Sequence, residues 1–221
     1  MIVIGLTGGM ASGKSACARY LKSRGVLVLD ADEVSRELTR GNNLGARRIK
    51  EELGERFFRG GELDRAETAR WAFASPQNTE KLNSIIHPLV ISRLEEEIKR
   101  LEREGQRAVV LDCPLLFESG LDKICAQIWL VTASYEIRLE RARLRSGLTR
   151  EEAQARISRQ LSDQSRAARS NLIRENNGSI KELEAKLKPL ADELLGGGRC
   201  VRRKRKKVKK PFGFARACWL F

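Results

Sequence analysis

The residues best suited to chemistry lie in a glycine-rich segment near the N-terminus. Gly8-Gly9-Met10-Ala11-Ser12-Gly13-Lys14-Ser15 matches the pattern G-x-x-x-x-G-K-[ST] in full. Glycines let successive backbone N–H groups surround a phosphate, and a helix that starts near Lys14 directs its positive dipole end to the same point. The Lys14 amine can reach the β- and γ-phosphates, and the Ser15 hydroxyl can ligate Mg²⁺. The segment predicts a nucleoside triphosphate site rather than a plain glycine turn before a surface helix.

Two carboxylates, Asp30 and Asp32, follow the second apolar run of the chain. This places them at the carboxyl edge of a predicted sheet, where ligands of such folds bind. Alternation along an extended chain would point both side chains the same way, unless a turn begins at this point. One of them could accept the proton of an acceptor hydroxyl or position its oxygen. The alternative is that they only cap a helix that starts near Glu33.

Three arginines, Arg138, Arg141 and Arg145, follow the fourth apolar run. Their spacing of three and four puts them on one face of a helix. Such a face is often only solvated, but three guanidinium groups could also clamp a triphosphate and neutralise the transferring phosphoryl group. The sequence contains no guanine-reading N-K-x-D motif, which argues against a GTPase. The arginines and carboxylates together favour a small-molecule kinase.

The elements that must position these residues alternate between short apolar runs and helical patterns. The runs are typical of buried parallel strands, the fifth being weak, and they cover residues 2–6, 26–29, 108–111, 128–131 and 172–173. The main helical patterns cover residues 16–23, 89–101, 135–164 and 180–195. This alternation predicts an α/β fold with a doubly wound parallel five-stranded sheet, and the long helical stretch between strands two and three forms an inserted lobe.

The charge of the chain is concentrated in its last part. The 221 residues carry a formal net charge of +14, but residues 196–221 contain ten Lys and Arg and no acidic residue. Such a basic run beside aromatic residues can bind RNA, although a disordered appendage is the favoured interpretation and nucleic-acid contact is not. The five cysteines show no C-x-x-C pairing and no stretch reaches 18 apolar residues. These features predict a cytoplasmic protein with reduced thiols and no membrane contact.

Several motifs occur together in a fixed order: Gly5-Leu6-Thr7 before the glycine-rich segment, Asp30-Ala31-Asp32, His87-Pro88, Asp112-Cys113-Pro114-Leu115-Leu116-Phe117-Glu118, the pair Arg141 and Arg145, Gln160, and Asn176-Asn177-Gly178-Ser179. In this the chain resembles the dephospho-coenzyme A kinase family of P-loop kinases. The resemblance implies Mg²⁺- and ATP-dependent phosphorylation of the ribose 3′-hydroxyl of dephospho-coenzyme A, which gives coenzyme A and ADP in the last step of coenzyme A biosynthesis. Another P-loop kinase, acting on a nucleoside monophosphate or a small alcohol, is the alternative. A nucleic-acid-tethered module is less favoured, and the oligomeric state stays open.

The resemblance also implies a division of the chain and a set of site residues. The expected parts are a nucleotide-binding core (1–32, 106–133 and 168–195), a helical acceptor-binding lobe (33–105) and a lid (134–167). The basic tail (196–221) has no counterpart in the family. The expected catalytic residues are Asp32, Lys14 and Arg141. The expected nucleotide-binding residues are Gly8, Gly9, Ala11, Ser12, Gly13, Lys14, Ser15, Ala16, Arg145 and Asn176. The expected acceptor-binding residues are Asp30, Asp32, His87, Asp112, Leu115 and Glu118, with Ser15 and Asp112 for the metal.

Three of these residues carry a condition, an alternative or a choice of roles. Many members of the family have glycine where Ala11 stands, and Ala11 keeps its N–H available to an anion if its φ stays negative. His87-Pro88 is also an ordinary way to begin a helix that runs from Leu89, with the proline in its first turn. Asp32 is expected to orient the acceptor hydroxyl at least as much as to deprotonate it, because phosphoryl transfer is mostly positioning and charge neutralisation.

Overall fold

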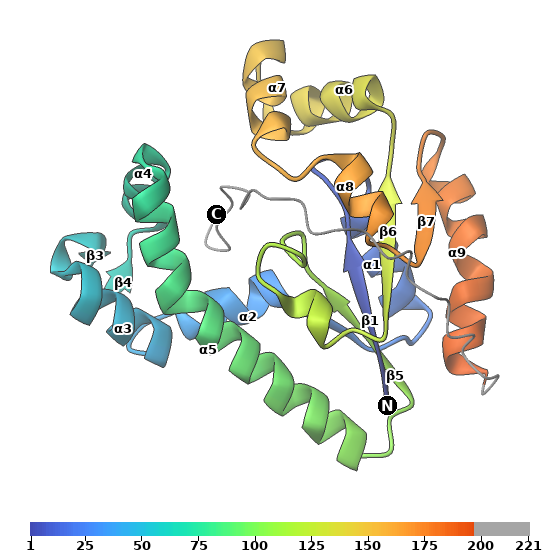
Figure 1. Cartoon of the computed structure of the whole chain (residues 1–221), viewed down its shortest axis with the longest axis horizontal. Helices are drawn as coiled ribbons and strands as arrows, with labels where there is room; N and C mark the ends of the chain where they lie inside the picture. The colour runs from blue at the N-terminus through green and yellow to red at the C-terminus, as the bar shows by residue number, and fades with distance from the viewer. Residues whose placement is uncertain (197–221) are drawn as a thin grey trace. The chain divides into compact units, whose positions relative to one another are not determined.

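The structure is a computed structural model that describes residues 1–196 (Figure 1). The rest of the predicted basic tail, residues 197–221, lies outside the described residues. Contacts divide the described chain into two compact units, one formed by Met1–Leu29 with the residues from Gly105 onward, and the other by Asp30–Glu104. No helix within residues 1–196 is long and apolar enough to cross a lipid bilayer.

The first unit is built on a five-stranded parallel sheet, so the predicted fold class is confirmed. Its strands run in the order β2-β5-β1-β6-β7. Their bounds are β1 Ile2–Thr7, β2 Val28–Asp30, β5 Ala108–Asp112, β6 Gln127–Thr132 and β7 Leu172–Glu175. The central strand β1 pairs with β5 through Ile4 and Val110, and with β6 through Ile4 and Gln127. Because β1, β5 and β6 are buried along almost their whole length, their sequences are continuous apolar runs without alternation.

Two helices of this unit cover the sheet and complete its core. They are α1, Lys14–Ser23, and α9, Ile180–Leu195, which pack against each other (Figure 1). Leu21 of α1 and Leu187 of α9 share one hydrophobic cluster with Ile4 of β1 and Trp129 of β6. This packing fixes the start of α1, and therefore the loop before it, relative to the end of β1.

The segment between β6 and β7 is helical, as the pattern over 135–164 predicts, but it is divided into three helices. It forms α6 (Tyr135–Ser146), α7 (Arg150–Ser158) and α8 (Asp163–Ala168). Gly147 ends α6 with a φ of 62°, and Thr149 begins α7 in a reciprocal capping box with Glu152. The Ser162 side chain caps α8. The two breaks allow α8 to turn back toward the sheet, where it contacts β6.

The second unit, Asp30–Glu104, is mostly helical and contains one small hairpin. Its elements are α2 (Ala31–Leu38), α3 (Leu44–Leu53), the 3₁₀ turn η1 (Glu55–Phe57), β3 (Phe58–Arg59), β4 (Glu62–Leu63), α4 (Arg65–Ala74) and α5 (Pro76–Arg103). The hairpin turns through Gly60 and Gly61, whose φ angles of 58° and 84° are those of a two-residue I′ loop. The long helix α5 packs against α2, α3 and α4.

The start of α5 corrects one alternative drawn from the sequence, because Pro88 does not begin a helix. Helix α5 begins at Pro76, where the Ser75 side chain accepts a hydrogen bond from the Asn78 N–H at 3.1 Å. Pro88 lies inside the helix, where it has no N–H to donate to the carbonyl one turn earlier. His87 is therefore a residue of the helix interior rather than a residue that precedes it.

Candidate active site

The glycine-rich loop connects β1 to α1 and leaves the first turn of α1 without a side-chain cap. Gly13 is the N-cap residue, with a φ of 100°, and the first turn of α1 contains no acidic residue. Within the loop, the Ser12 N–H donates to the Gly9 carbonyl at 3.1 Å. The buried Ser12 hydroxyl oxygen has no hydrogen-bond partner among residues 1–196. The arrangement leaves donors at the positive end of a helix dipole, which suits a phosphate group.

Two glycines of this loop lie so close to side chains from distant parts of the chain that a Cβ atom would collide with them. A Cβ on Gly9 would lie 2.5 Å from an Arg138 nitrogen, and a Cβ on Gly13 would lie 2.1 Å from the Asn176 amide nitrogen. The Asn176 side chain donates to the Ser12 carbonyl at 2.9 Å. Asn176, expected among the nucleotide-binding residues, is therefore placed against the backbone of the loop that would hold the phosphates.

Ala11 departs from the expectation made for it. Its φ is 59°, so the condition of a negative φ is not met. The left-handed conformation brings the Ala11 Cβ close to its own carbonyl, at a cost of about 1–2 kcal/mol. The curl of the loop requires this conformation, which a glycine would adopt without strain.

Ala11→Gly is expected to raise the free energy of unfolding by about 1 kcal/mol, because it relieves the strained backbone. Urea denaturation measures the change. Ala155→Gly, at an exposed position inside α7, is the matched control and should lower the same quantity by a similar amount. If both variants are destabilised alike, Ala11 does not have a positive φ in solution.

Lys14 and Asp112 form the polar centre of the site. Lys14 is the first residue of α1 and Asp112 the last residue of β5, which pairs with β1. The Lys14 Nζ lies 2.5 Å from Asp112 Oδ1, and both side chains are largely buried. The ion pair keeps the amine over the loop, where it can move from the carboxylate to a phosphate.

The donor atoms around this pair suit a hard divalent cation. The exposed Ser15 hydroxyl follows Lys14, and the Asp112 carboxylate ends the neighbouring strand. Hydroxyl, carboxylate and phosphate oxygens are the ligands that Mg²⁺ takes in nucleotide sites. Ala16, the next residue, is half-buried and packs on the core of the sheet.

The three arginines of α6 have different surroundings and do not present one common face to solvent. Arg138 is buried, donates from Nε to the Met10 carbonyl at 2.9 Å and pairs with Asp163. Arg141 donates to the carbonyl oxygens of Asn176 at 2.8 Å and Gly178 at 3.0 Å. Arg145 is exposed. Arg138 therefore supports the loop, whereas Arg145 is the one of the three most open to a ligand.

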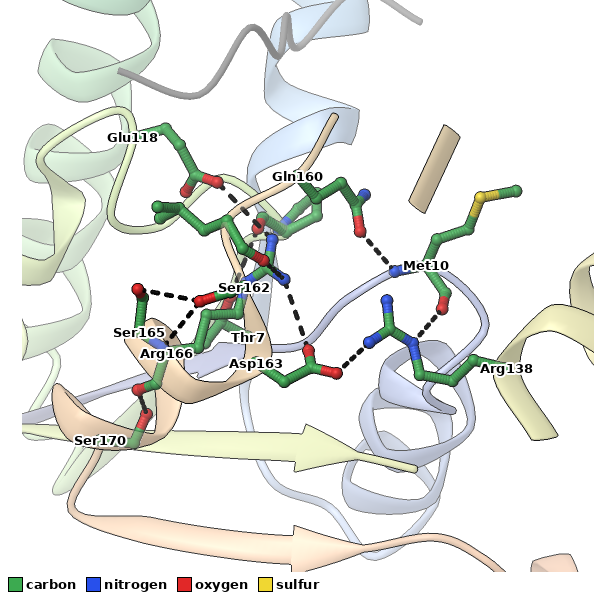
Figure 2. Close-up of polar contacts among 12 residues, drawn as sticks. Thr7, Met10, Glu118, Arg138, Gln160, Ser162, Asp163, Ser165, Arg166 and Ser170 are labelled. Carbon is green, nitrogen blue, oxygen red and sulfur yellow. Dashed lines mark hydrogen bonds and ion pairs between the residues drawn. The ribbon is translucent and has the colours of Figure 1, made fainter. Parts of the chain in front are cut away.

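Sequence reasoning did not single out Asp163 and Arg166, which the structure brings into the same unit beside Arg138. Figure 2 shows the two residues together with Glu118, Gln160 and Met10. The Gln160 side-chain oxygen accepts a hydrogen bond from the Met10 N–H at 2.8 Å. In a highly charged stretch, the sequence does not distinguish a buried arginine from a solvated one. Only the structure shows that Arg166 is buried.

Besides Asp112, two expected acceptor-binding residues of this unit have buried side chains. Leu115 is 4% exposed in the turn after β5. Glu118 Oε1 lies 3.6 Å from an Arg166 nitrogen. Burial raises the pKa of Glu118, and the positive charge of Arg166 opposes this effect. In this structure, Glu118 therefore faces protein rather than solvent.

The carboxylates after β2 are positioned by the start of α2. Asp30 Oδ1 accepts hydrogen bonds from the N–H groups of Asp32 at 2.9 Å and Glu33 at 3.2 Å, so the capping alternative is confirmed for Asp30. The helix begins at Ala31 rather than near Glu33. Asp32 already belongs to the first turn of the helix, so the alternative of a turn applies and strand alternation does not extend to Asp32.

His87 lies in the interior of α5, the core helix of the second unit. Burial lowers the pKa of His87 to about 4. A base with so low a pKa is neutral at ordinary pH, which makes His87 a hydrogen-bonding or packing residue rather than a proton acceptor with a pKa near neutrality.

The pH dependence of stability should carry the signature of this histidine, the only one in the chain. Its folded-state pKa of about 4 lies below the ordinary 6.5. Its contribution is therefore present above pH 6.5 and is lost as the pH falls toward 4. We expect the wild type to lose about 1–2 kcal/mol more than His87→Gln between pH 7 and pH 5, measured by urea denaturation at both values. Equal losses in the two proteins would mean that His87 is not desolvated.

These features define a class of protein. The phosphate-binding loop lies between the central strand of a parallel sheet and the first helix. An acidic residue ends the neighbouring strand and lies beside the loop lysine. This is the arrangement of a P-loop phosphotransferase. The family model described as dephospho-CoA kinase matches residues 2–182. The chain belongs to the dephospho-CoA kinase family, and it is an enzyme of the phosphotransferase class.

Individual relatives agree with this assignment. A dephospho-CoA kinase of Deinococcus radiodurans is 41% identical over 187 residues, which cover 83% of this chain and 88% of the relative. A dephospho-CoA kinase of Fusobacterium nucleatum is 34% identical over 194 residues, or 88% and 99% of the two chains. The crystal structure of TT1252 from Thermus thermophilus has a TM-score of 0.71 at 40% identity and covers 87% of this chain and 97% of its own. A dephospho-CoA kinase from Campylobacter jejuni, with a TM-score of 0.68 at 22% identity and coverages of 88% and 98%, has the same fold.

Proposed function

We propose that this chain transfers the γ-phosphoryl group of ATP to the ribose 3′-hydroxyl of dephospho-coenzyme A, which gives coenzyme A and ADP. The observation that carries the proposal is the Lys14–Asp112 pair at 2.5 Å over an uncapped phosphate loop, in a chain that the family model matches over residues 2–182. ATP and dephospho-coenzyme A are the two substrates, and the reaction takes place in the cytoplasm.

The loop residues bind and neutralise the triphosphate. Backbone N–H groups of the phosphate loop and of the first turn of α1 surround the β-phosphate, and the Lys14 amine exchanges its contact with Asp112 for the β- and γ-phosphates. Ser15 and Asp112 would hold Mg²⁺, which when bound would neutralise charge on the β- and γ-phosphates. Arg141 and Arg145 belong to a lid of residues 134–167 that supplies further positive charge to the transferring group.

The acceptor hydroxyl is oriented by the second unit of the chain. Asp32, held in the first turn of α2 by the Asp30 cap, accepts the proton of the ribose hydroxyl or fixes its oxygen for attack on the γ-phosphorus. The compact unit Asp30–Glu104 supports its assignment as the acceptor-binding lobe, with His87 among the residues that contact dephospho-coenzyme A. Since the reaction is mostly positioning and charge neutralisation, correct placement of these groups accounts for most of the rate.

An assay with the purified full-length protein tests the proposal. ATP and Mg²⁺ are supplied with dephospho-coenzyme A in one reaction and with nucleoside monophosphates, gluconate or shikimate in the others, and ADP formation and the phosphorylated product are measured. We expect a product only with dephospho-coenzyme A. Phosphorylation of one of the other acceptors, with none of dephospho-coenzyme A, would show a different kinase of the P-loop class.

A further inference from the structure

Four charged side chains form a continuous series through the first unit. They come from three separate elements, the turn after β5, α8 and α6, and run in the order Glu118, Arg166, Asp163 and Arg138 (Figure 2). Arg166 lies between Glu118 Oε1 at 3.6 Å and Asp163 Oδ1 at 3.7 Å. The other oxygen of Asp163 pairs with Arg138. The series therefore alternates in charge from one end to the other.

One end of the series holds the phosphate loop at Met10. Arg138 Nε donates to the Met10 carbonyl at 2.9 Å, and the Met10 N–H donates to Gln160 at 2.8 Å (Figure 2). Both polar groups of one loop residue are thus fixed by side chains from the segment between β6 and β7. The next residue, Ala11, is the one with the strained positive φ. The hydrogen bonds at Met10 hold the backbone where this strain is located.

The other end of the series is buried and has few hydrogen bonds of its own. Arg166 is 0% exposed, and its Nη1 donates to the Leu161 carbonyl at 2.6 Å. Its Nε and Nη2 make no hydrogen bond within residues 1–196. A buried ion pair with incomplete hydrogen bonding adds little to stability, because desolvation offsets most of its attraction. Stability alone therefore does not explain why charges occupy this part of the core.

We propose that Glu118, Arg166 and Asp163 are positioning residues of the phosphate loop, acting through Arg138 on Met10. Glu118 balances Arg166, Arg166 orients Asp163, and Asp163 holds the guanidinium that fixes the loop in its triphosphate-binding shape. The role differs from the acceptor contact expected for Glu118. It rests on the proposed function only in that the loop binds ATP.

The first test replaces Asp163, whose side chain is 35% exposed, so that the variant folds. Asp163→Asn keeps the shape of the side chain and removes the charge between two guanidinium groups. We expect its Kd for ATP with Mg²⁺, measured by isothermal titration calorimetry, to rise about 3- to 10-fold. The Kd for dephospho-coenzyme A should stay within about twofold of the wild type.

Asp122→Asn provides the matched control. Asp122 pairs with Arg169 at 3.1 Å, just after α8, and the Arg169 guanidinium lies over the Phe117 ring. This carboxylate also neutralises an arginine of the same region but lies outside the series that ends at Met10. The Kd of the Asp122→Asn variant for ATP should equal that of the wild type. If Asp122→Asn and Asp163→Asn weaken ATP binding equally, or neither does, the proposal is wrong.

A double-mutant cycle tests transmission along the whole series. Glu118→Gln and Arg138→Lys lie at its two ends, and their effects on the Kd for ATP should be non-additive by about threefold or more. Additive effects, or a lowered melting temperature with an unchanged Kd for ATP, would show a purely structural role. If Arg138→Lys does not fold, the cycle is built from Glu118→Gln and Asp163→Asn instead.

Because ATP binding is measured without phosphoryl transfer, a wild type that binds ATP but does not phosphorylate dephospho-coenzyme A overturns only the proposed function.

Discussion

Lys14→Met is expected to lower the kcat of phosphoryl transfer by about a thousandfold. The methionine side chain has a similar length but no charge, so the β- and γ-phosphates lose a cation in a site from which water is partly excluded. Steady-state assays at saturating ATP and dephospho-coenzyme A measure the change. Lys22→Met, at an exposed position in the last turn of the same helix, should leave kcat unchanged.

The same substitution should also lower stability, because it leaves the 4% exposed Asp112 beside an uncharged side chain. We expect a loss of about 1–3 kcal/mol in the free energy of unfolding. Adding Asp112→Asn to Lys14→Met should restore much of this stability and none of the activity. A Lys14→Met protein with wild-type kcat would contradict the assignment of Lys14 to the phosphates, whatever its stability.

Asp32→Asn is expected to lower kcat by about 100- to 10,000-fold while the KM for dephospho-coenzyme A changes by less than about threefold. The amide keeps the size of the side chain but is a poor proton acceptor and orients a hydroxyl differently. The helix start should be unaffected, since Asp30 supplies the cap. Initial rates across a range of acceptor concentrations separate the two constants.

Glu33→Gln is the matched control for Asp32. Glu33 is an exposed carboxylate in the same first turn of α2, and its N–H is bonded to the same cap oxygen. The Glu33→Gln variant should retain wild-type kcat and KM. A normal turnover in Asp32→Asn would instead leave Asp32 as a first-turn acidic residue that only stabilises the helix dipole.

The sheet and the phosphate loop could be predicted because their signals are local. Buried parallel strands are uninterrupted apolar runs, and even the weak run at 172–173 proved to be part of β7. The break in the helical pattern at Gly147 was not predicted, although its signal is also local. Thr149 and Glu152 form a capping box, and this signal lies within an arginine-rich stretch. The sequence offers two places where a proline could stand in the first turn of a helix, Pro76 and Pro88. The helix begins at Pro76, with Ser75 as its N-cap, so the start near Pro88 was wrong.

The supports of the site could not be predicted in the same way, because they join residues that are distant in the sequence. The positive φ of Ala11 belongs to a loop held by Arg138 and Gln160, which lie far along the chain. Arg166 has the same sequence surroundings as the exposed arginines near it, and only the packing of α8 against β6 makes it a core residue. Sequence reasoning finds the residues of a phosphate site more readily than the residues that hold it.

The contact between Gly13 and Asn176 has a consequence for synthesis on the ribosome. The phosphate-loop sequence is complete after the first fifteen residues, but the strands on both sides of β1 and the amide that closes on Gly13 follow only much later. A nascent chain that ends before Asn176 carries the motif without the amide that closes on Gly13. Because non-local pairing of this kind forms late in folding, we expect ATP affinity to arise only when the whole of β7 and Asn176 have left the exit tunnel. The phosphate loop is thus first in the sequence and among the last parts to become functional.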